Sequence, residues 1–283
     1  MKKLSIAVLL FGVLLSTKAQ ETRGEPKGNW KKAGLINFLF NQSAFNNWLA
    51  GGTNSISGTL GLNYDINYAK GNWTWDNKII ASYGLTKLKD KEAEKTDDRF
   101  ELSSLVGKKA TKNWYYSAFV NFKTQMSSTY VEDIQQSHFF SPAYFQFGPG
   151  MLWKKSDSLK INIAPATSKL VIVNRDFTKN LSAKSTYFGV KTNSTMRYEL
   201  GAALNVYYKF NLMKNVFVEN ILNLYSNYLE EAKNVDIDYT VNTVMKINKY
   251  LSANLALQSI YDDNAFEGFQ TREIFGLGVN YNF

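Results

Sequence analysis

Cysteine is absent from this chain of 283 residues, and histidine occurs once, as His138. Without cysteine there are no disulfide bonds, thiolate metal sites, cysteine nucleophiles or lipidated N-terminal cysteine. A single imidazole excludes every site that needs two histidines. Proline (4) and glycine (18) are too scarce for a fibrous chain, and 45% hydrophobic residues are too many for a disordered one.

Long hydrophobic runs are also missing after the first residues of the chain. No later run approaches about 18 uninterrupted apolar residues, so no membrane-spanning helix is expected. A closed β-barrel is then the remaining way to cross a membrane. The length favours one large domain, since barrels commonly reach this size as a single unit.

The start of the chain has the pattern of a secretory signal peptide. Two lysines precede an apolar stretch over 4–15, and residues 17–19 resemble a small-residue cleavage site. We expect cleavage after Ala19, a short periplasmic segment over 20–29 and a barrel over 30–283. Loss of the three leader lysines lowers the formal charge from +9 to +6, and the remaining bases are scattered. Nucleic acid is therefore not an expected partner.

Period-two alternation of apolar and polar residues runs through the rest of the chain. It is clearest over 195–210, where Met196 and Leu204 share one face and Arg197 and Glu199 the other. Marking every such run predicts twelve strands, at about 31–41, 54–69, 72–87, 97–110, 113–130, 141–155, 158–175, 193–210, 215–229, 234–248, 250–262 and 270–283. Prolines 142, 149 and 165 interrupt two of them and leave their register open, with a β-bulge as the expected cause.

The predicted connections alternate between short turns and longer loops, the longer ones at 41–53, 87–96, 127–140, 176–192 and 262–270. Short turns on one rim, long loops on the other and an even strand count are typical of an outer-membrane barrel with both chain ends at the periplasmic rim. A soluble sandwich or smaller soluble barrel also alternates, but its strands are typically about 5–6 residues long. The aromatic ending at Tyr281 and Phe283 has the pattern of a C-terminal assembly signal, which implies the barrel-assembly machinery as a partner during biogenesis. The sequence therefore predicts an all-β, transmembrane, antiparallel up-and-down barrel.

Six segments in order resemble a known family. The first segment is 46–55, which contains Asn46-Asn47-Trp48 and Gly51-Gly52. The other five segments are 97–98, 121–125, 141–144, 164–169 and 261–263. Together they are similar to the uncharacterised outer-membrane proteins of Bacteroidota grouped as domain of unknown function 3078, over roughly residues 30–283. The resemblance implies a barrel of the cell envelope without an assigned activity, and it supplies no catalytic residue.

Charged residues on the polar faces of the predicted strands are the main candidate site. On the lipid side each mid-membrane Lys or Arg would cost about 2–4 kcal/mol, so these side chains are expected to point into the lumen. There they either line a narrow aqueous channel or pair across the lumen and close it, and size alone leaves both open for twelve strands. They are Asp65, Asp76, Lys78, Arg99, Glu101, Lys123, Arg197, Glu199, Lys209, Glu219, Asp236, Asp238 and Lys246.

A second candidate is the loop before the second strand. Asn47 and Trp48 with the flexible pair Gly51 and Gly52 form either a constriction or sugar-stacking platform at the barrel mouth, or an interfacial tryptophan anchor, which is the commoner arrangement.

Neither catalysis nor a metal site is expected. His138 lies beside Ser137 without a nucleophile motif, so a solvated or loop-packing role is favoured over a hydrolase. The acidic pairs 97–98 and 262–263 lack the ligand spacing of a Ca²⁺ loop, which needs about 6–8 oxygen ligands.

Three functions fit this interpretation. The first is a narrow passive pore for small hydrophilic solutes, and the second is a non-conducting barrel that serves as an accessory or scaffold subunit of an outer-membrane complex. The third is an outer-membrane hydrolase using His138. Outer-membrane lipid and an unidentified envelope protein are the expected partners, and no cofactor is expected.

Overall fold

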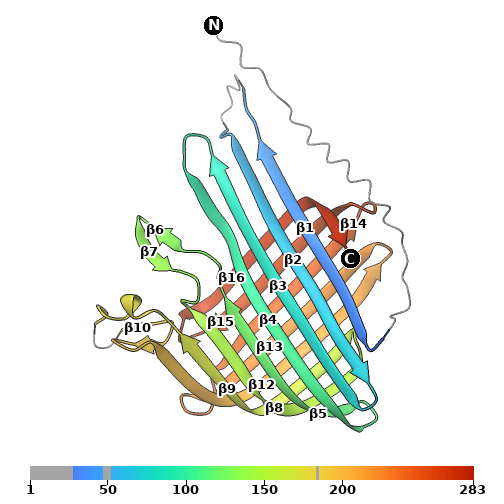
Figure 1. Cartoon of the computed structure of the whole chain (residues 1–283). Coiled ribbons are helices and arrows are strands. Elements are labelled where there is room, and N and C mark those ends of the chain that lie inside the picture. The colour runs from blue at the N-terminus through green and yellow to red at the C-terminus, as the bar shows by residue number, and fades with distance from the viewer. Residues whose placement is uncertain (1–27, 47–51, 183–184) are drawn as a thin grey trace.

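Twelve long antiparallel strands close into a barrel in the computed structural model, which describes residues 28–46, 52–182 and 185–283 (Figure 1). Around the barrel the order is β1-β16-β15-β14-β13-β12-β9-β8-β5-β4-β3-β2. The strands are β1 (Trp30–Ser43), β2 (Ser55–Lys70), β3 (Trp73–Leu88), β4 (Ala93–Thr111), β5 (Trp114–Thr124), β8 (Ala143–Ser156), β9 (Leu159–Ile172), β12 (Met196–Met213), β13 (Val216–Asn227), β14 (Val235–Lys246), β15 (Leu251–Asp262) and β16 (Phe266–Asn282). The predicted fold class and strand number are confirmed.

No helix within the described residues is long and apolar enough to span a membrane. The expected signal peptide over 1–19 and most of the periplasmic segment over 20–29 lie outside the described residues.

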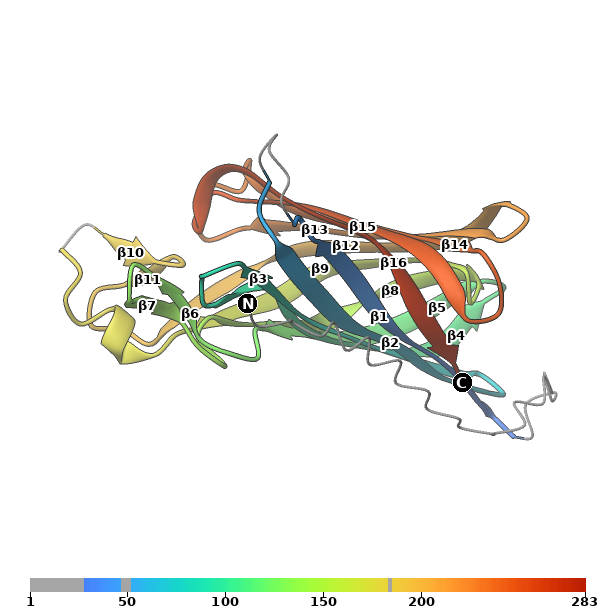
Figure 2. The same cartoon turned by 90° about the horizontal axis from the view of Figure 1, so that it is seen from above.

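Two of the long loops carry small hairpins of their own. β6 (Thr129–Val131) and β7 (Ile134–Ser137) lie between β5 and β8, while the short helix η1 (Arg175–Phe177), β10 (Thr186–Tyr187) and β11 (Val190–Lys191) lie between β9 and β12. Both loops extend from the same end of the barrel, side by side (Figure 2). The Tyr187 hydroxyl donates to the backbone carbonyl of Gln136 and joins them. We call residues 125–142, 173–182 and 185–195 the outer cap.

Two of the predicted long loops are wrong. β3 and β4 continue to Leu88 and Ala93, and β15 and β16 are joined by residues 263–265 alone. The alternation is interrupted in these segments because each ladder carries a register shift, between Gly84 and Leu85 in β3–β4 and between Tyr261 and Asp262 in β15–β16. In the other direction, the strand expected over 113–130 ends at Thr124, and the chain then enters the outer cap.

Prolines 149 and 165 lie at irregularities of the ladder. The β8–β9 register shifts between Phe147 and Met151, and the β9–β12 register shifts opposite residues 164–167. A proline has no N–H to donate, so a ladder accommodates it where the pairing is already interrupted. The expected bulge is confirmed, and it explains why the alternation around these prolines was ambiguous.

The outer wall of the barrel is apolar. Its large exposed side chains include Phe38, Leu60, Phe275 and Leu277, each 46–61% exposed. An apolar surface that encircles a closed barrel is the lipid-facing surface of a transmembrane protein, and it excludes the soluble sandwich. Tryptophans 73, 75 and 114 lie on this wall near the short-turn rim, where aromatic residues anchor barrels at the membrane interface.

The barrel closes through its shortest strand pairing. β1 and β16 share six residue pairs, whereas β2 and β3 share sixteen. Reciprocal backbone hydrogen bonds of 2.8 and 3.0 Å between Gly34 and Phe283 continue the seam to the last residue. The Phe283 ring covers Gly34 and lies 5.4 Å from the Tyr64 ring, while Tyr281 projects from the outer wall. The C-terminal aromatic pair is thus part of the seam, and its role as an assembly signal remains a proposal.

The Gly201→Ala substitution is expected to destabilise the barrel, because a Cβ there would lie 1.9 Å from the Ser226 carbonyl oxygen of the next strand. Overpacking of this kind costs about 1–3 kcal/mol. The stability of the variant is compared with that of the wild type by the temperature at which the folded band disappears in a heat-modifiable gel shift. Gly58→Ala is the control, since its Cβ meets the movable ring of Phe38 at 3.3 Å and the Leu39 carbonyl oxygen at 3.9 Å, which is an ordinary van der Waals contact. Equal stability of the two variants would contradict the close contact at Gly201.

Candidate functional site

A buried ion pair joins opposite walls of the lumen. Lys78 on β3 and Glu219 on β13 lie half-way round the strand order from each other, and their Nζ and Oε1 atoms are 2.8 Å apart. The two side chains are 13% and 7% exposed. Alternation from opposite strands places both on the inward face, and the contact needs the full reach of the two side chains.

Further groups complete this crossing, which we call the central bridge. Lys78 also donates to Asn63 at 2.8 Å and pairs with Asp65 at 3.2 Å. Glu219 accepts hydrogen bonds from the Tyr207 hydroxyl at 2.9 Å and from the Asn242 amide at 3.0 Å. The bridge therefore uses β2, β3, β12, β13 and β14, and it leaves the buried charges with partners.

A second crossing lies beside the central bridge. Lys123 on β5 pairs with Asp238 on β14, which also accepts from Gln258 at 3.0 Å. On the neighbouring strand β4, Arg99 binds Glu101 at 2.7 Å and reaches the Thr240 hydroxyl of β14 at 3.5 Å. These contacts again tie one wall to the opposite one.

A third cluster surrounds Lys169 near the rim that carries the outer cap. Its ammonium lies 2.7 Å from Asp236, 3.1 Å from Asp262 and 3.7 Å from Glu199. Arg197 binds Glu199 at 3.1 Å and also reaches Glu230 of the β13–β14 loop.

Other inward charges pair nearer the short turns or across the seam. Lys154 and Lys160 both contact Asp76, at 2.8 and 3.2 Å, and Arg272 contacts Asp97 at 2.6 Å. Of the predicted lumen residues, Lys209 and Lys246 stand apart: both are exposed at the short-turn rim.

Sequence reasoning missed several of these partners. Lys154, Lys160 and Lys169 lie on the two strands whose alternation the prolines disturb, and Asp262 was assigned to a loop. Before the bulge in β9, Lys160 and Asn162 alternate with Leu159 and Ile161. The period-two pattern that identifies inward residues was therefore present on that side of the bulge.

Apolar side chains fill much of the remaining lumen on one side. Phe119, Ala164, Ala203 and Tyr225 form a buried cluster, with Leu105 packed against it. Space inside the barrel is thereby divided into cavities: two of about 120 Å³, one beside the central bridge at Lys78 and one around Arg272, and an outer one of about 200 Å³ under the outer cap.

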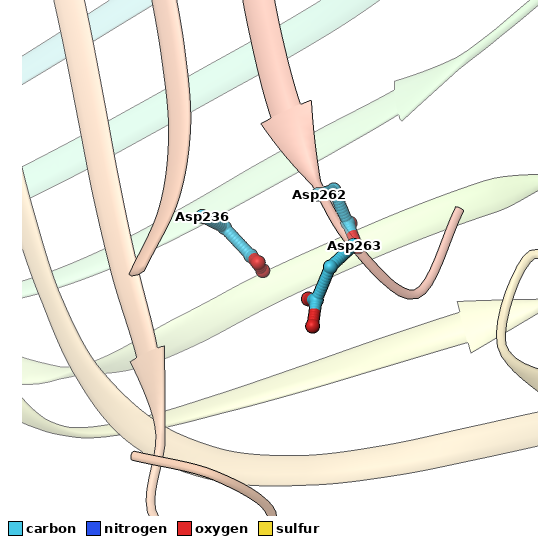
Figure 3. Close-up of side chains that lie close together, drawn as sticks. All are labelled: Asp236, Asp262 and Asp263. Atoms are coloured by element: carbon cyan, nitrogen blue, oxygen red, sulfur yellow. The ribbon is translucent and has the colours of Figure 1, made fainter. Parts of the chain in front are cut away.

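Three carboxylates gather at the outer rim. Asp236, Asp262 and Asp263 bring oxygen atoms within 4.8 Å of one another (Figure 3). The Lys169 ammonium already contacts Asp236 and Asp262, and Asp263 accepts from Asn234 at 2.7 Å and Asn264 at 2.9 Å. The donor set is thus satisfied by side chains of the barrel itself, so its arrangement gives no support for a metal site.

His138 joins the two loops of the outer cap. Its Nε2 lies 3.0 Å from the Asn174 amide, its Nδ1 lies 2.7 Å from the Phe139 carbonyl, and its ring lies 5.4 Å from that of Phe177. These contacts occupy both ring nitrogens with loop groups, which is a packing arrangement rather than that of a general base.

The predicted mouth loop is described only in part. Asn47, Trp48 and Gly51 lie outside the described residues. Gly52 has a φ of +138°, a conformation that favours glycine, and the Phe45 ring fills the space where a Cβ would lie.

A family model matches part of the chain. Residues 40–130 match the model of a family described as "Protein of unknown function (DUF3078)", which confirms the resemblance over that segment. No curated protein matches the chain.

Solved structures similar to the chain are barrels. The translocator domain of the autotransporter NalP from Neisseria meningitidis is 9% identical, with 89% of this chain and 88% of that one covered and a TM-score of 0.39. An outer membrane channel from Pseudomonas putida F1 is 9% identical, with 90% and 94% covered and a TM-score of 0.37. The channel DcaP of Acinetobacter baumannii is 11% identical, with 90% and 97% covered and a TM-score of 0.35. All three TM-scores are below 0.5, so the fold rests on the chain's own strand pairing.

Replacing Lys78 with methionine is expected to destabilise the barrel by about 3–5 kcal/mol, because Glu219 and Asp65 then stay in the lumen without their cation. The double variant Lys78→Met/Glu219→Leu is expected to be more stable than the single variant, since it removes the uncompensated charge of Glu219. Guanidinium unfolding of the vesicle-embedded barrel, followed by tryptophan fluorescence, measures both.

The control is Lys31→Met, whose ion pair with Asp157 at the rim is exposed and worth about 0–1 kcal/mol. A Lys78→Met midpoint equal to that of Lys31→Met would contradict a structural role for the central bridge.

Proposed function

We propose that this chain, whose residues 40–130 match the family of unknown function DUF3078, is an outer-membrane barrel that is closed to solutes at rest and acts through its outer face. The observation that carries the proposal is the central bridge between Lys78 and Glu219, which joins opposite walls of the lumen. The polar interior thus serves here to hold the barrel together. Of the functions that the sequence left open, this favours the non-conducting barrel.

The size of the barrel makes such closure practicable. About eight strands give an interior that side chains fill, and about sixteen leave an aqueous channel. With twelve strands, long side chains from opposite walls still meet, as the pairs Lys78–Glu219 and Lys123–Asp238 illustrate. A solute crossing the lumen must first separate buried, hydrogen-bonded charges, and that is costly.

A narrow pore is the second candidate, and one observation favours it. The outer cavity and the cavity beside the central bridge share Asn121, Lys123 and Asn223 in their walls. Displacement of the Lys123 side chain from Asp238 would therefore join two cavities into one path. Transport on this proposal requires an opening step, in contrast to a permanently open porin.

The outer cap supports a role in contact with other envelope components. Tyr130, Val131 and Ile134 on its β6–β7 hairpin are 56–64% exposed although they are apolar. Exposed apolar groups outside the lipid band are typical of contact surfaces. Export by a cleaved signal peptide, assembly by the barrel-assembly machinery and an envelope partner complete the proposal.

The wild-type barrel is expected to give no steady conductance in a planar lipid bilayer bathed in concentrated potassium chloride. The variant that carries Lys78→Ala, Glu219→Ala, Lys123→Ala and Asp238→Ala is expected to conduct in discrete steps, because both crossings of the lumen are removed. Single-channel recording measures both.

The matched control is Lys31→Ala/Asp157→Ala, which removes an exposed lysine–aspartate pair at the rim and leaves Lys154, a second partner of Asp157, paired with Asp76. It is expected to stay silent like the wild type. Steady wild-type conductance would overturn the closed barrel and establish the pore, and a silent quadruple variant that is folded by heat-modifiable mobility would show that other side chains close the lumen.

A further inference from the structure

The outer cavity has the form of a pocket with a floor, walls and a cover. Its volume is about 200 Å³, far above the roughly 10–15 Å³ that a single water needs. The Lys123–Asp238 pair lies at its inner end. At its outer end lie Ala265 in the β15–β16 turn and Phe188 in the β10–β11 turn, so it reaches the rim that carries the outer cap.

The cover is built by a tight hairpin. Phe188 and Gly189, with φ of +49° and +74°, turn the chain between β10 and β11, as in the two-residue turns that favour glycine. Arg197 packs directly beneath Gly189, and Val190 is fully buried against Val171 and Val173. The Phe188 ring consequently lies edge-on to the Tyr144 ring at 6.5 Å, above the cavity.

Charges that line this cavity are already paired with one another. Lys169 binds Asp236 and Asp262, and Lys123 binds Asp238. A charged ligand would have to break one of these pairs to gain a counter-ion. The lining holds two lysines and three aspartates, and each of them is engaged in one of these pairs. A ligand without net charge is the one that leaves all of these pairs intact.

Two amides and a hydroxyl in the same cavity are uncommitted. Asn121 and Gln146 face each other across β5 and β8, and among the described residues neither amide makes a side-chain hydrogen bond. The Tyr225 hydroxyl is buried and lacks a hydrogen-bond partner, in a residue that is 3% exposed and lines the cavity. Buried polar groups are normally hydrogen-bonded, and of these three groups the Tyr225 hydroxyl is the buried one. The partly exposed Asn121 and Gln146 amides are available to a ligand in the cavity.

The chemistry of these groups selects a class of ligand. An amide both donates and accepts, as a sugar hydroxyl does, and aromatic faces suit the apolar side of a sugar ring. We propose that the outer cavity binds a neutral hydroxylated ring of monosaccharide size, with Asn121 and Gln146 contacting its hydroxyls and Tyr144 and Phe188 flanking it. This inference rests on the proposed function, because it names the class of ligand that the outer face would bind. The site does not require a closed barrel, since in a conducting barrel it would lie at the entrance of the pore.

The test is saturation-transfer NMR on the folded barrel in a detergent without sugar headgroups. The probes are the methyl glycosides of glucose, galactose, mannose and N-acetylglucosamine, with lysine and glutamate as charged molecules of similar size. At least one glycoside is expected to bind and the charged molecules are not. Asn121→Ala and Gln146→Ala are each expected to weaken binding about tenfold, as the loss of one neutral hydrogen bond implies.

Asn67→Ala is the matched control, since Asn67 lines the cavity beside the central bridge instead. It is expected to leave the glycoside affinity unchanged. If maltotriose displaces the glycoside, the ring that binds is the end of a glycan. If maltotriose does not displace it, the ligand is a free sugar. Both results support the site.

Absence of binding by every glycoside, binding of lysine or glutamate in their place, or equal weakening by Asn67→Ala would overturn it. The conductance recordings are independent of this result, so failure of the sugar site and failure of the closed barrel are separately visible.

Discussion

Lipid on the outside of the barrel is the constraint on which the rest of the structure depends. Because charge is costly against lipid, period-two alternation sends the Lys, Arg, Asp and Glu of the spanning strands inward. Inside a twelve-stranded barrel these side chains are long enough to meet from opposite walls, as Lys78 and Glu219 do. The same requirement that makes the outer wall apolar thus closes the lumen.

Side chains fill the lumen in some places and leave it open in others, and the proposed function follows from this difference. Ion pairs and the apolar cluster around Phe119 occupy the interior, whereas the space under the outer cap stays open at about 200 Å³. The charged side chains there are engaged in ion pairs, Lys169 with two aspartates and Lys123 with a third. Among the described residues, the neutral polar groups of this space that make no side-chain hydrogen bond include Asn121, Gln146 and the Tyr225 hydroxyl. The proposed ligand site therefore lies at the outer end of the barrel.

Most of the fold could be predicted from the sequence, because burial on one side alone imposes a strict period of two. The strands predicted at 54–69 and 72–87 differ from β2 and β3 by one residue at each end. Prediction failed where that constraint is absent. The register shifts in the ladders of β3–β4 and β15–β16 and again at prolines 149 and 165, and each shift breaks the period of two.

The sequence by itself determined which face of each strand a residue occupies, since alternation and the cost of charge in lipid are both local properties. Only the tertiary structure decided which inward charge meets which. Lys78 and Glu219 are far apart in the chain, and their contact depends on strand order, tilt and register around the whole barrel. The cavity under the outer cap arises in the same way, because its walls come from β5, β8, β9, β13, β14, β15 and β16 and its cover from the β10–β11 turn.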